Sequence, residues 1–301
     1  MSNSGRNSLR RAVSAIREGL SLLSPWLPRS RISMYDLIST RNLLGEKTLY
    51  LNLGYWDSST TYDNACQRLA EVVGEIGSMS PADEVVDCGF GFADQDFYWL
   101  ERFKPRRITG LNITISQVVE ARRRADERGI SPERLDLREG SATAMPLADA
   151  SADLVTALES AFHFDTREAF FREAFRVLRP GGRLVTADIL LRTDAVRTLK
   201  AAVLKWLVLR TWQIPAANVY DRCEYERKLS ESGFVSIRVD CIQEKVYRPL
   251  FDCVRQRMRD SDIKMRMNVF FRLFWAVGMK EVEALWPDYI LSVSVKPEEK
   301  A

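Results

Sequence analysis

From residue 84 onward, short apolar runs alternate with stretches whose apolar positions recur every three or four residues. The first pattern predicts buried strands and the second predicts amphipathic helices. Their regular alternation is typical of a doubly wound α/β fold, in which helices cover both faces of a mostly parallel sheet. We expect a seven-stranded, Rossmann-like sheet with strands within 84–92, 106–114, 135–142, 152–160, 183–190, the second half of 223–242, and 288–297.

Four amphipathic stretches supply the helices expected around the first five strands. They are 61–79, 94–103, 115–129 and 166–182. Glycine commonly ends a helix, so we expect the last of them to be closed by the glycines of "RPGG".

The N-terminal stretch 8–27 places apolar residues at helical spacing and arginines mostly elsewhere, which predicts an amphipathic basic helix. Such a helix can lie on an anionic membrane surface or pack on its own domain, and the pattern leaves both open. We divide the chain into a helical N-terminal extension, 1–47, and a sheet domain, 48–301. Two helical cap insertions are expected in that domain, at about 194–222 and 248–285.

The composition of the chain argues against several function classes. Its 301 residues carry a net charge of only +3, which gives no whole-molecule field for nucleic acid. Five scattered cysteines without a CxxC pair argue against a disulfide framework and a metal site, and favour a reducing compartment such as the cytoplasm. Neither a membrane span nor a secretory signal is evident.

A possible ligand loop follows the first expected strand. Asp87 precedes Gly89 and Gly91, and glycine is needed where backbone approaches a ligand closely or takes a positive φ. In open α/β sheets, ligands bind at this carboxyl edge, although two glycines after a strand can also form a simple packing turn. Asp94 stands where a dinucleotide fingerprint requires a third glycine, which disfavours NAD.

Polar and small residues end the next three strands at the same edge. Asn112 lies where ribose hydroxyls are usually read, and its amide can both accept from and donate to a diol. The third strand ends in "GSA", which leaves room for a flat adenine, and the fourth brings Glu159 and His163 toward the crevice. These positions together favour a nucleotide-like ligand.

Successive motifs along the chain resemble those of the class I S-adenosylmethionine-dependent methyltransferases. They are "VVDCGFGFA", "GLNITISQ", "EGSATAMPLADASADLV", "ALESAFHF" and "FREAFRVLRPGGRLVTADIL". Within that superfamily the chain is most similar to the sterol, tocopherol, ubiquinone and natural-product methyltransferases, over about residues 48–297. The resemblance implies S-adenosylmethionine as cofactor, S-adenosylhomocysteine as its product, and a seven-stranded methyltransferase fold.

The resemblance also implies roles for individual residues. The strand-end acid Asp87 would belong to the cofactor site, and the rest are assigned by the part of the cofactor that they would meet. Gly89 and Gly91 would line the methionine and ribose part, Asn112, Ile113 and Gln117 the ribose and adenine, Ser141 and Ala142 the adenine, Leu158 and Glu159 the sulfonium, with Tyr50, Tyr55 and Trp56 in the lid.

Four positions depart from the family pattern. Ala93 replaces the last glycine of the loop, Phe90 replaces a small residue, and Asn112 and Ser141 replace acids. Together these changes leave open the alternative that cofactor binding is weakened and the pocket is degenerate and inactive.

His163 is the only histidine, and imidazole can accept a proton near neutral pH. The resemblance places it on the substrate side as a general base or as a residue that orients the acceptor, with Tyr55 as its partner across the site. A structural role for a lone histidine is the alternative.

The expected acceptor is a hydrophobic or lipid-like small molecule methylated on oxygen or carbon, because aromatic residues gather around the motifs and caps. A polar secondary metabolite and a non-catalytic binding protein are the alternatives.

Overall fold

The computed structural model describes residues 45–59, 61–190, 213–260 and 288–298, together with 202, 206 and 209. Several sequence predictions lie outside these residues. They are the basic helix 8–27, the N-terminal extension apart from residues 45–47, most of the first cap insertion, and the later part of the second. The division at residue 47 stays a prediction.

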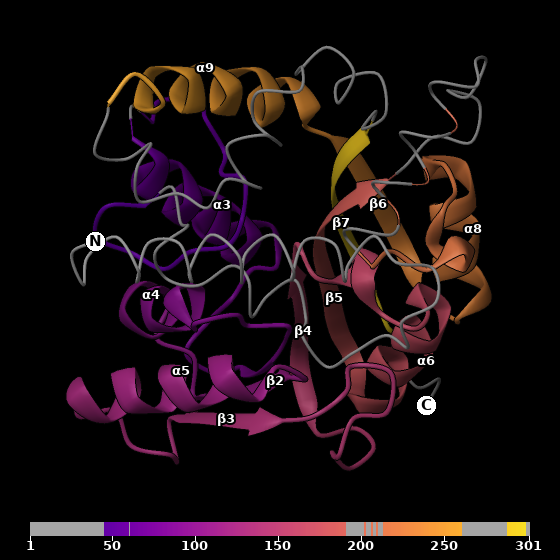
Figure 1. The fold of residues 1–301 in the computed structure, drawn as a ribbon. Helices are drawn as coiled ribbons and strands as arrows, with labels where there is room; N and C mark the ends of the chain where they lie inside the picture. The colour runs from indigo at the N-terminus through magenta and orange to yellow at the C-terminus, as the bar shows by residue number, and fades with distance from the viewer. Residues whose placement is uncertain are drawn as a thin grey trace, which may run out of the picture.

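The seven strands form one sheet, which confirms the predicted fold class (Figure 1). The strand order is β3-β2-β1-β4-β5-β7-β6, and only β7 runs antiparallel to its neighbours. The strand bounds are β1 Glu84–Cys88, β2 Arg107–Asn112, β3 Leu135–Glu139, β4 Ala152–Leu158, β5 Leu178–Leu190, β6 Val235–Cys241 and β7 Asp288–Val295.

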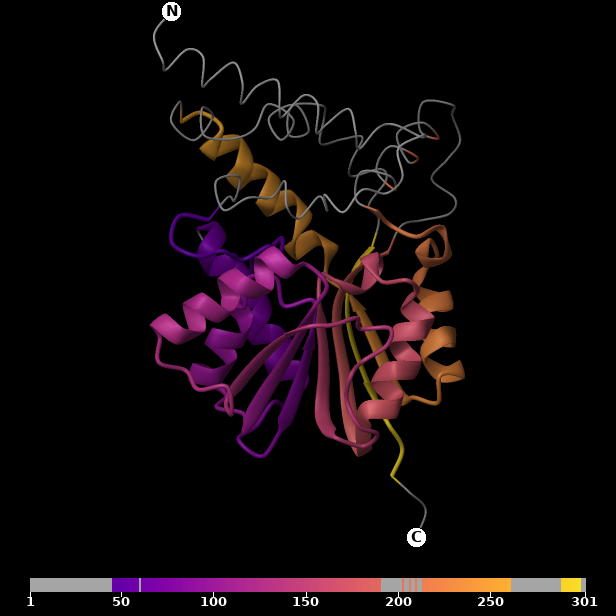
Figure 2. The same ribbon diagram turned by 60° about the horizontal axis from the view of Figure 1, so that its bottom comes forward.

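Helices cover both faces of the sheet, as Figure 2 shows. Their bounds are α3 Tyr62–Ile76, α4 Asp94–Arg102, α5 Ile115–Glu127, α6 Arg167–Val177, α8 Arg222–Glu231 and α9 Tyr247–Arg257. Val85 packs with α3, α4 and α5 in one hydrophobic core, whereas Val86 packs with α6 and α8 in another. This division follows from the strand, whose successive side chains point to opposite faces.

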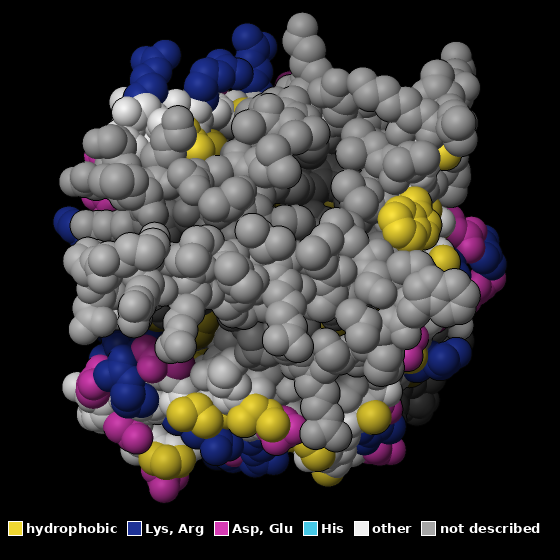
Figure 3. Space-filling model, viewed as in Figure 1, with side chains coloured by type: hydrophobic (Ala, Val, Ile, Leu, Met, Phe, Trp, Pro, Cys, Tyr) yellow, Lys and Arg dark blue, Asp and Glu magenta, His cyan; other side chains and the backbone are white. Residues whose placement is uncertain are grey.

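Helix α9 crosses beyond the carboxyl ends of the parallel strands (Figure 2). Its buried side chains Leu250, Phe251 and Val254 join the core that contains α3. Arg248 and Arg255 are exposed on the same helix, and Figure 3 shows the basic side chains that stand out at this edge of the molecule. α9 therefore belongs to the sheet domain through its apolar face.

One predicted boundary is wrong. We expected a helix over 166–182, but α6 ends at Val177 and β5 begins at Leu178. Pro180 cannot continue a helix, and Gly181, at a φ of 76°, donates its N–H to the carbonyl of Lys296. Long-range pairing with the chain after β7 thus determines that residues 178–182 are extended and not helical. Local periodicity in the sequence does not reveal this pairing.

Asp94 has a structural role at the first turn of α4. Its carboxylate forms a two-pronged ion pair with Arg124 of α5, at 2.6 and 2.8 Å, and each side chain is only 8% exposed. Arg124 also donates to the carbonyl of Phe92. The residue that argued against a dinucleotide loop therefore ties α4 to α5.

We expect Asp94→Ala to lower the free energy of unfolding by about 3 kcal/mol, because it leaves the buried Arg124 guanidinium without its charge partner. Urea unfolding followed by circular dichroism measures the change. Asp94→Ala combined with Arg124→Met removes both charges, and we expect this pair to recover most of the loss. Equal instability of the single and double variants would contradict the assignment.

Candidate functional site

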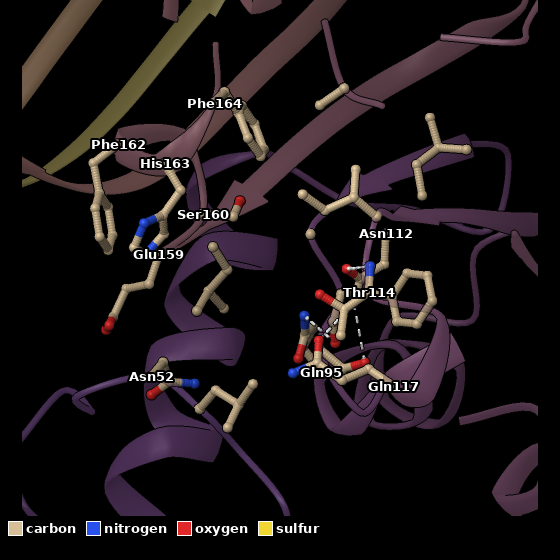
Figure 4. Close-up of a pocket in the computed structure, with 18 of the residues that line it drawn as sticks. Asn52, Gln95, Asn112, Thr114, Gln117, Glu159, Ser160, Phe162, His163 and Phe164 are labelled. Carbon is tan, nitrogen blue, oxygen red and sulfur yellow. Dashed lines mark hydrogen bonds between the residues drawn. The ribbon is translucent and has the colours of Figure 1, made fainter. Parts of the chain in front are cut away.

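A cavity of about 280 Å³ lies at the carboxyl ends of β1, β2 and β4. Ten of the residues singled out in the sequence line it. They are Gly89, Gly91, Asn112, Ile113, Gln117, Ser141, Ala142, Leu158, Glu159 and His163. Figure 4 shows two groups of side chains in this cavity, with Glu159, Phe162 and His163 on one side and Gln95, Asn112, Thr114 and Gln117 on the other.

The glycine loop after β1 packs closely, and positive φ angles disfavour side chains at both of its glycines. Gly89 has a φ of 86°, and a Cβ there would lie 2.4 Å from Cβ of Ser160. Gly91 has a φ of 58°, and its Cβ would lie 3.0 Å from Leu51. Ala93 takes a left-handed φ of 66° without being glycine. The backbone of this loop therefore forms part of the cavity wall.

Asp87 lies behind this loop rather than in the cavity lining. It is fully buried, and its carboxylate accepts hydrogen bonds from Gln95 Nε2 at 3.0 Å and Thr156 Oγ1 at 2.8 Å. Burial raises the pKa of Asp87 to about 6, although both hydrogen bonds oppose this. Gln95 does line the cavity. Asp87 therefore contacts the cavity wall through its hydrogen bond with Gln95, a residue that the sequence motifs did not single out.

Asn112 and Gln117 form a hydrogen-bonded pair on the β2 side. Asn112 Nδ2 donates to Gln117 Oε1 at 2.9 Å, and Asn112 Oδ1 accepts from the N–H of Thr114 at 3.0 Å. Gln117 is 3% exposed, and its Nε2 has no hydrogen-bond partner among the described residues. A buried amide donor without a partner is costly, so a ligand acceptor at this point would be stabilising.

Glu159 directly follows β4 and takes a left-handed conformation, with a φ of 51°. Its Oε1 accepts hydrogen bonds from the N–H of Leu53, at 2.6 Å, and from the hydroxyl of Tyr289 on β7. Burial raises the pKa of Glu159 to about 8, against the effect of these two hydrogen bonds. The side chain therefore changes charge within an experimentally accessible range of pH.

His163 is the last residue of the short 3₁₀ helix η1, Ala161–His163. Its ring centroid lies 3.9 Å from that of Phe162. Phe162, Ile189 and Ile214 line the same cavity and make its surroundings largely apolar. The single histidine and an apolar pocket thus occur together.

The three expected lid residues lie outside the lining of the cavity. The hydroxyl of Tyr50 donates to the carbonyl of Asp94, and Trp56 Nε1 donates to that of Leu53. The hydroxyl of Tyr55 accepts a hydrogen bond from Lys245 at 2.7 Å. The roles expected for Tyr50, Tyr55 and Trp56, including that of Tyr55 beside His163, have no counterpart in the described cavity lining.

The segment that carries these residues does reach the cavity, through its other side chains. The lining includes Leu49, Leu51, Asn52 and Leu53, none of which the motifs singled out. Only the spacing of apolar residues in "LYLNLGY" could have indicated that this segment packs against the site.

Comparison with known proteins identifies the family. A family model described as a methyltransferase domain matches residues 86–186. The erythromycin 3''-O-methyltransferase of Saccharopolyspora erythraea is 35% identical over 285 residues, which cover 90% of this chain and 91% of that protein. The chain belongs to the S-adenosylmethionine-dependent methyltransferases. The fold of this methyltransferase is also found in solved structures of low sequence identity.

Two of these structures illustrate the range of the fold. One is the [4+2]-cyclase SpnF, which has a TM-score of 0.64 and 21% identity, with 82% of this chain and 88% of that chain covered. The other is geranyl diphosphate C-methyltransferase from Streptomyces coelicolor A3(2), in complex with S-adenosylhomocysteine. It has a TM-score of 0.63 and 18% identity, with 79% of this methyltransferase and 80% of that chain covered.

The cavity has the features that the cofactor of this methyltransferase, S-adenosylmethionine, requires. The glycine backbone leaves a cradle that a Cβ would fill. The unpartnered Nε2 of Gln117 offers a donor where the resemblance expects the ribose and adenine. The replacement of acids by Asn112 and Ser141 thus leaves a pocket with hydrogen-bonding groups of its own.

Proposed function

We propose that this methyltransferase methylates a hydroxyl group of an apolar small-molecule natural product. The observation that carries the proposal is His163, which lines the same cavity as the glycine loop. A hydroxyl acceptor must lose a proton when its oxygen is methylated, whereas a cofactor pocket alone needs no base. The O-methyltransferase named above, similar over nearly its whole length, supports methylation on oxygen.

Apolar side chains from several elements support the hydrophobic character of the acceptor. They come from the segment before α3, from η1, from β5 and from the chain before η2, Ala216–Asn218. They are Leu53, Phe162, Ile189 and Ile214. A pocket of this kind binds an apolar ligand by removing its surface from water, and a few polar groups fix its orientation.

In this mechanism, bound S-adenosylmethionine supplies an electrophilic methyl group on a positively charged sulfur. The glycine loop and Gln117 would hold the cofactor, and the cavity would orient the acceptor oxygen for transfer of the methyl group. The imidazole of His163 accepts the proton that the hydroxyl loses as its oxygen bonds to carbon. The electron pair of the broken bond stays on sulfur, and His163 returns the proton to water.

The proposal is tested with the purified protein, methyl-labelled S-adenosylmethionine, and matched pairs of apolar natural products with a free or a blocked hydroxyl. We expect label only in the compounds with a free hydroxyl, as a methyl ether identified by mass spectrometry. Label in the blocked compounds, or only in polar metabolites, would show that the proposed acceptor class is wrong.

We expect Glu159 to make the binding of S-adenosylmethionine dependent on pH. Its pKa of about 8 means that the carboxyl gains charge as pH rises from 7 to 9, and the resemblance places it at the sulfonium. The sulfur of S-adenosylhomocysteine carries no charge. The ratio of the affinity for S-adenosylmethionine to that for S-adenosylhomocysteine then increases about tenfold from about pH 7 to pH 9. Calorimetric titration of both ligands measures the ratio, in which the groups common to both cancel.

Glu159→Gln is the matched variant for this titration, because glutamine keeps the shape but cannot ionise. Its affinity ratio is expected to stay constant with pH. A ratio that rises equally in both proteins would assign the pH dependence to another group.

In the described part of the chain, no helix combines the length and apolar character that a bilayer crossing needs. Contact of residues 8–27 with a membrane surface and a cytoplasmic location stay predictions from the sequence. Sedimentation with anionic vesicles, compared between the full chain and a chain that starts at residue 45, would measure the first.

A further inference from the structure

Two backbone hydrogen bonds close the turn that carries His163. Within it, the N–H of His163 donates to the carbonyl of Ser160 at 3.0 Å, and that of Phe164 donates to the carbonyl of Ala161 at 3.1 Å. One turn of 3₁₀ helix is weakly stable by itself. Groups outside the turn therefore contribute to fixing the position of the imidazole.

Asn218, at the end of η2, contacts the backbone on both sides of His163. Its Nδ2 donates to the carbonyl of Phe162 at 3.1 Å and to that of Phe164 at 2.8 Å. Asn218 is 1% exposed, so water does not compete for these hydrogen bonds. A single amide group thus joins the two peptide carbonyls that flank His163.

Asn218 is itself held by a buried ion pair. Its Oδ1 accepts from the N–H of Arg167 at 2.9 Å, and its backbone carbonyl accepts from the Arg167 guanidinium. Arg167 and Asp188 are both fully buried, and Arg167 Nε lies 2.7 Å from Asp188 Oδ2. Arg167 also donates to the carbonyl of Ile189, which lines the cavity. This network links η1, the start of α6, the end of β5 and η2.

The asparagine side chain matches the hydrogen-bonding groups around it, which are two carbonyl acceptors and one N–H donor. The amide gives two N–H donors to the carbonyls and one acceptor to the N–H of Arg167. Aspartate keeps the acceptor oxygen for the N–H of Arg167 and has a similar volume. Its second carboxylate oxygen, however, would face the carbonyl oxygens of Phe162 and Phe164. Alanine removes all three hydrogen bonds.

We propose that Asn218 is a positioning residue that holds the His163 turn in place for proton transfer. This inference rests on the proposed function of His163. Asn218 is not among the residues that line the cavity, and it acts through the two flanking carbonyls. Its loss is expected to lower kcat about tenfold or more and to leave the affinity for S-adenosylhomocysteine within about threefold.

The test uses the full chain, purified without a histidine tag and labelled with ¹³C in the histidine ring. Because His163 is the only histidine, the labelled Cε1 of its ring gives one carbon resonance that reports the position of the turn. Asn218→Ala and Asn218→Asp are compared with Tyr225→Phe, which removes a buried hydroxyl that hydrogen-bonds to Thr186 and makes no contact with the turn. We expect the resonance to move and kcat to fall in both Asn218 variants, with neither effect in Tyr225→Phe.

The proposal is overturned if either folded Asn218 variant keeps the wild-type resonance or the wild-type kcat. Aspartate can pair with Arg167, so Asn218→Asp is expected to fold even if Asn218→Ala does not. Failure of both to fold would assign Asn218 to the fold alone and overturn the proposal. His163→Ala, measured in parallel, separates the two ideas. Full activity there would refute the proposed function, whereas the resonance would still decide whether Asn218 holds the turn.

Discussion

His163→Ala is expected to lower kcat about 10³-fold while the affinity for S-adenosylmethionine stays within about threefold. The variant removes the only imidazole in the chain, which is the group proposed to accept the hydroxyl proton in this cavity. Single-turnover assays with a hydroxyl acceptor measure the chemical step apart from product release.

Two controls separate proton transfer from loss of shape in that experiment. His163→Gln keeps a polar side chain of similar reach without a usable base, and it is expected to be as slow as the alanine variant. Added imidazole, or an acceptor whose hydroxyl is already more acidic, is expected to restore part of the rate of the alanine variant. A rate insensitive to both changes would show that His163 is structural.

Gly89→Ala is expected to weaken cofactor binding about 100-fold and to lower the free energy of unfolding by about 2 kcal/mol. The new Cβ would lie 2.4 Å from Cβ of Ser160, and Gly89 holds a φ of 86° that alanine rarely adopts. Ser160 cannot turn away easily, because its hydroxyl donates to the carbonyl of Cys88 at 2.6 Å. Calorimetry and urea unfolding measure the two effects.

Gly129→Ala is the matched control for this prediction. Gly129 has a φ of 64°, but a Cβ there meets nothing within 4 Å, so it carries the conformational strain without the clash. We expect it to lose stability and keep its cofactor affinity. Ser160→Gly added to Gly89→Ala removes the clash and is expected to recover part of the binding. Equal affinities for the Gly89 and Gly129 variants would contradict a role for close packing.

The positions of β1, β2 and β4 along the chain could be predicted because these strands are buried on both faces. Their sequences are continuous apolar runs ended by glycine or polar residues, and that pattern is local. The end of α6 could not be predicted in this way. Leu178 leaves the helix because it pairs with Ala152 in the sheet, and this contact is invisible to helical periodicity.

Short sequence motifs predicted the part of the cavity that their own residues line. They could not predict the part that distant segments of the chain complete. Gly89 and Gln117 stand in recognisable motifs, and both line the cavity. Tyr289 reaches Glu159 across 130 residues, and Asn218 reaches Phe162 across 56. In the segment before α3 the motif identified a stretch that reaches the cavity, but the lining comes from Leu49, Leu51, Asn52 and Leu53 and not from the residues singled out.

The attachment of Asn218 to the His163 turn also sets rules for building hybrid enzymes from related methyltransferases. Exchanging the chain between Leu190 and Ile214 is a natural way to transfer acceptor preference, since Ile214 lines the cavity. The downstream junction then belongs before Pro215, so that Asn218 and Arg167 come from the same parent and keep their mutual hydrogen bonds. In a hybrid joined after Asn218, Asn218 comes from one parent and the His163 turn that it contacts comes from the other.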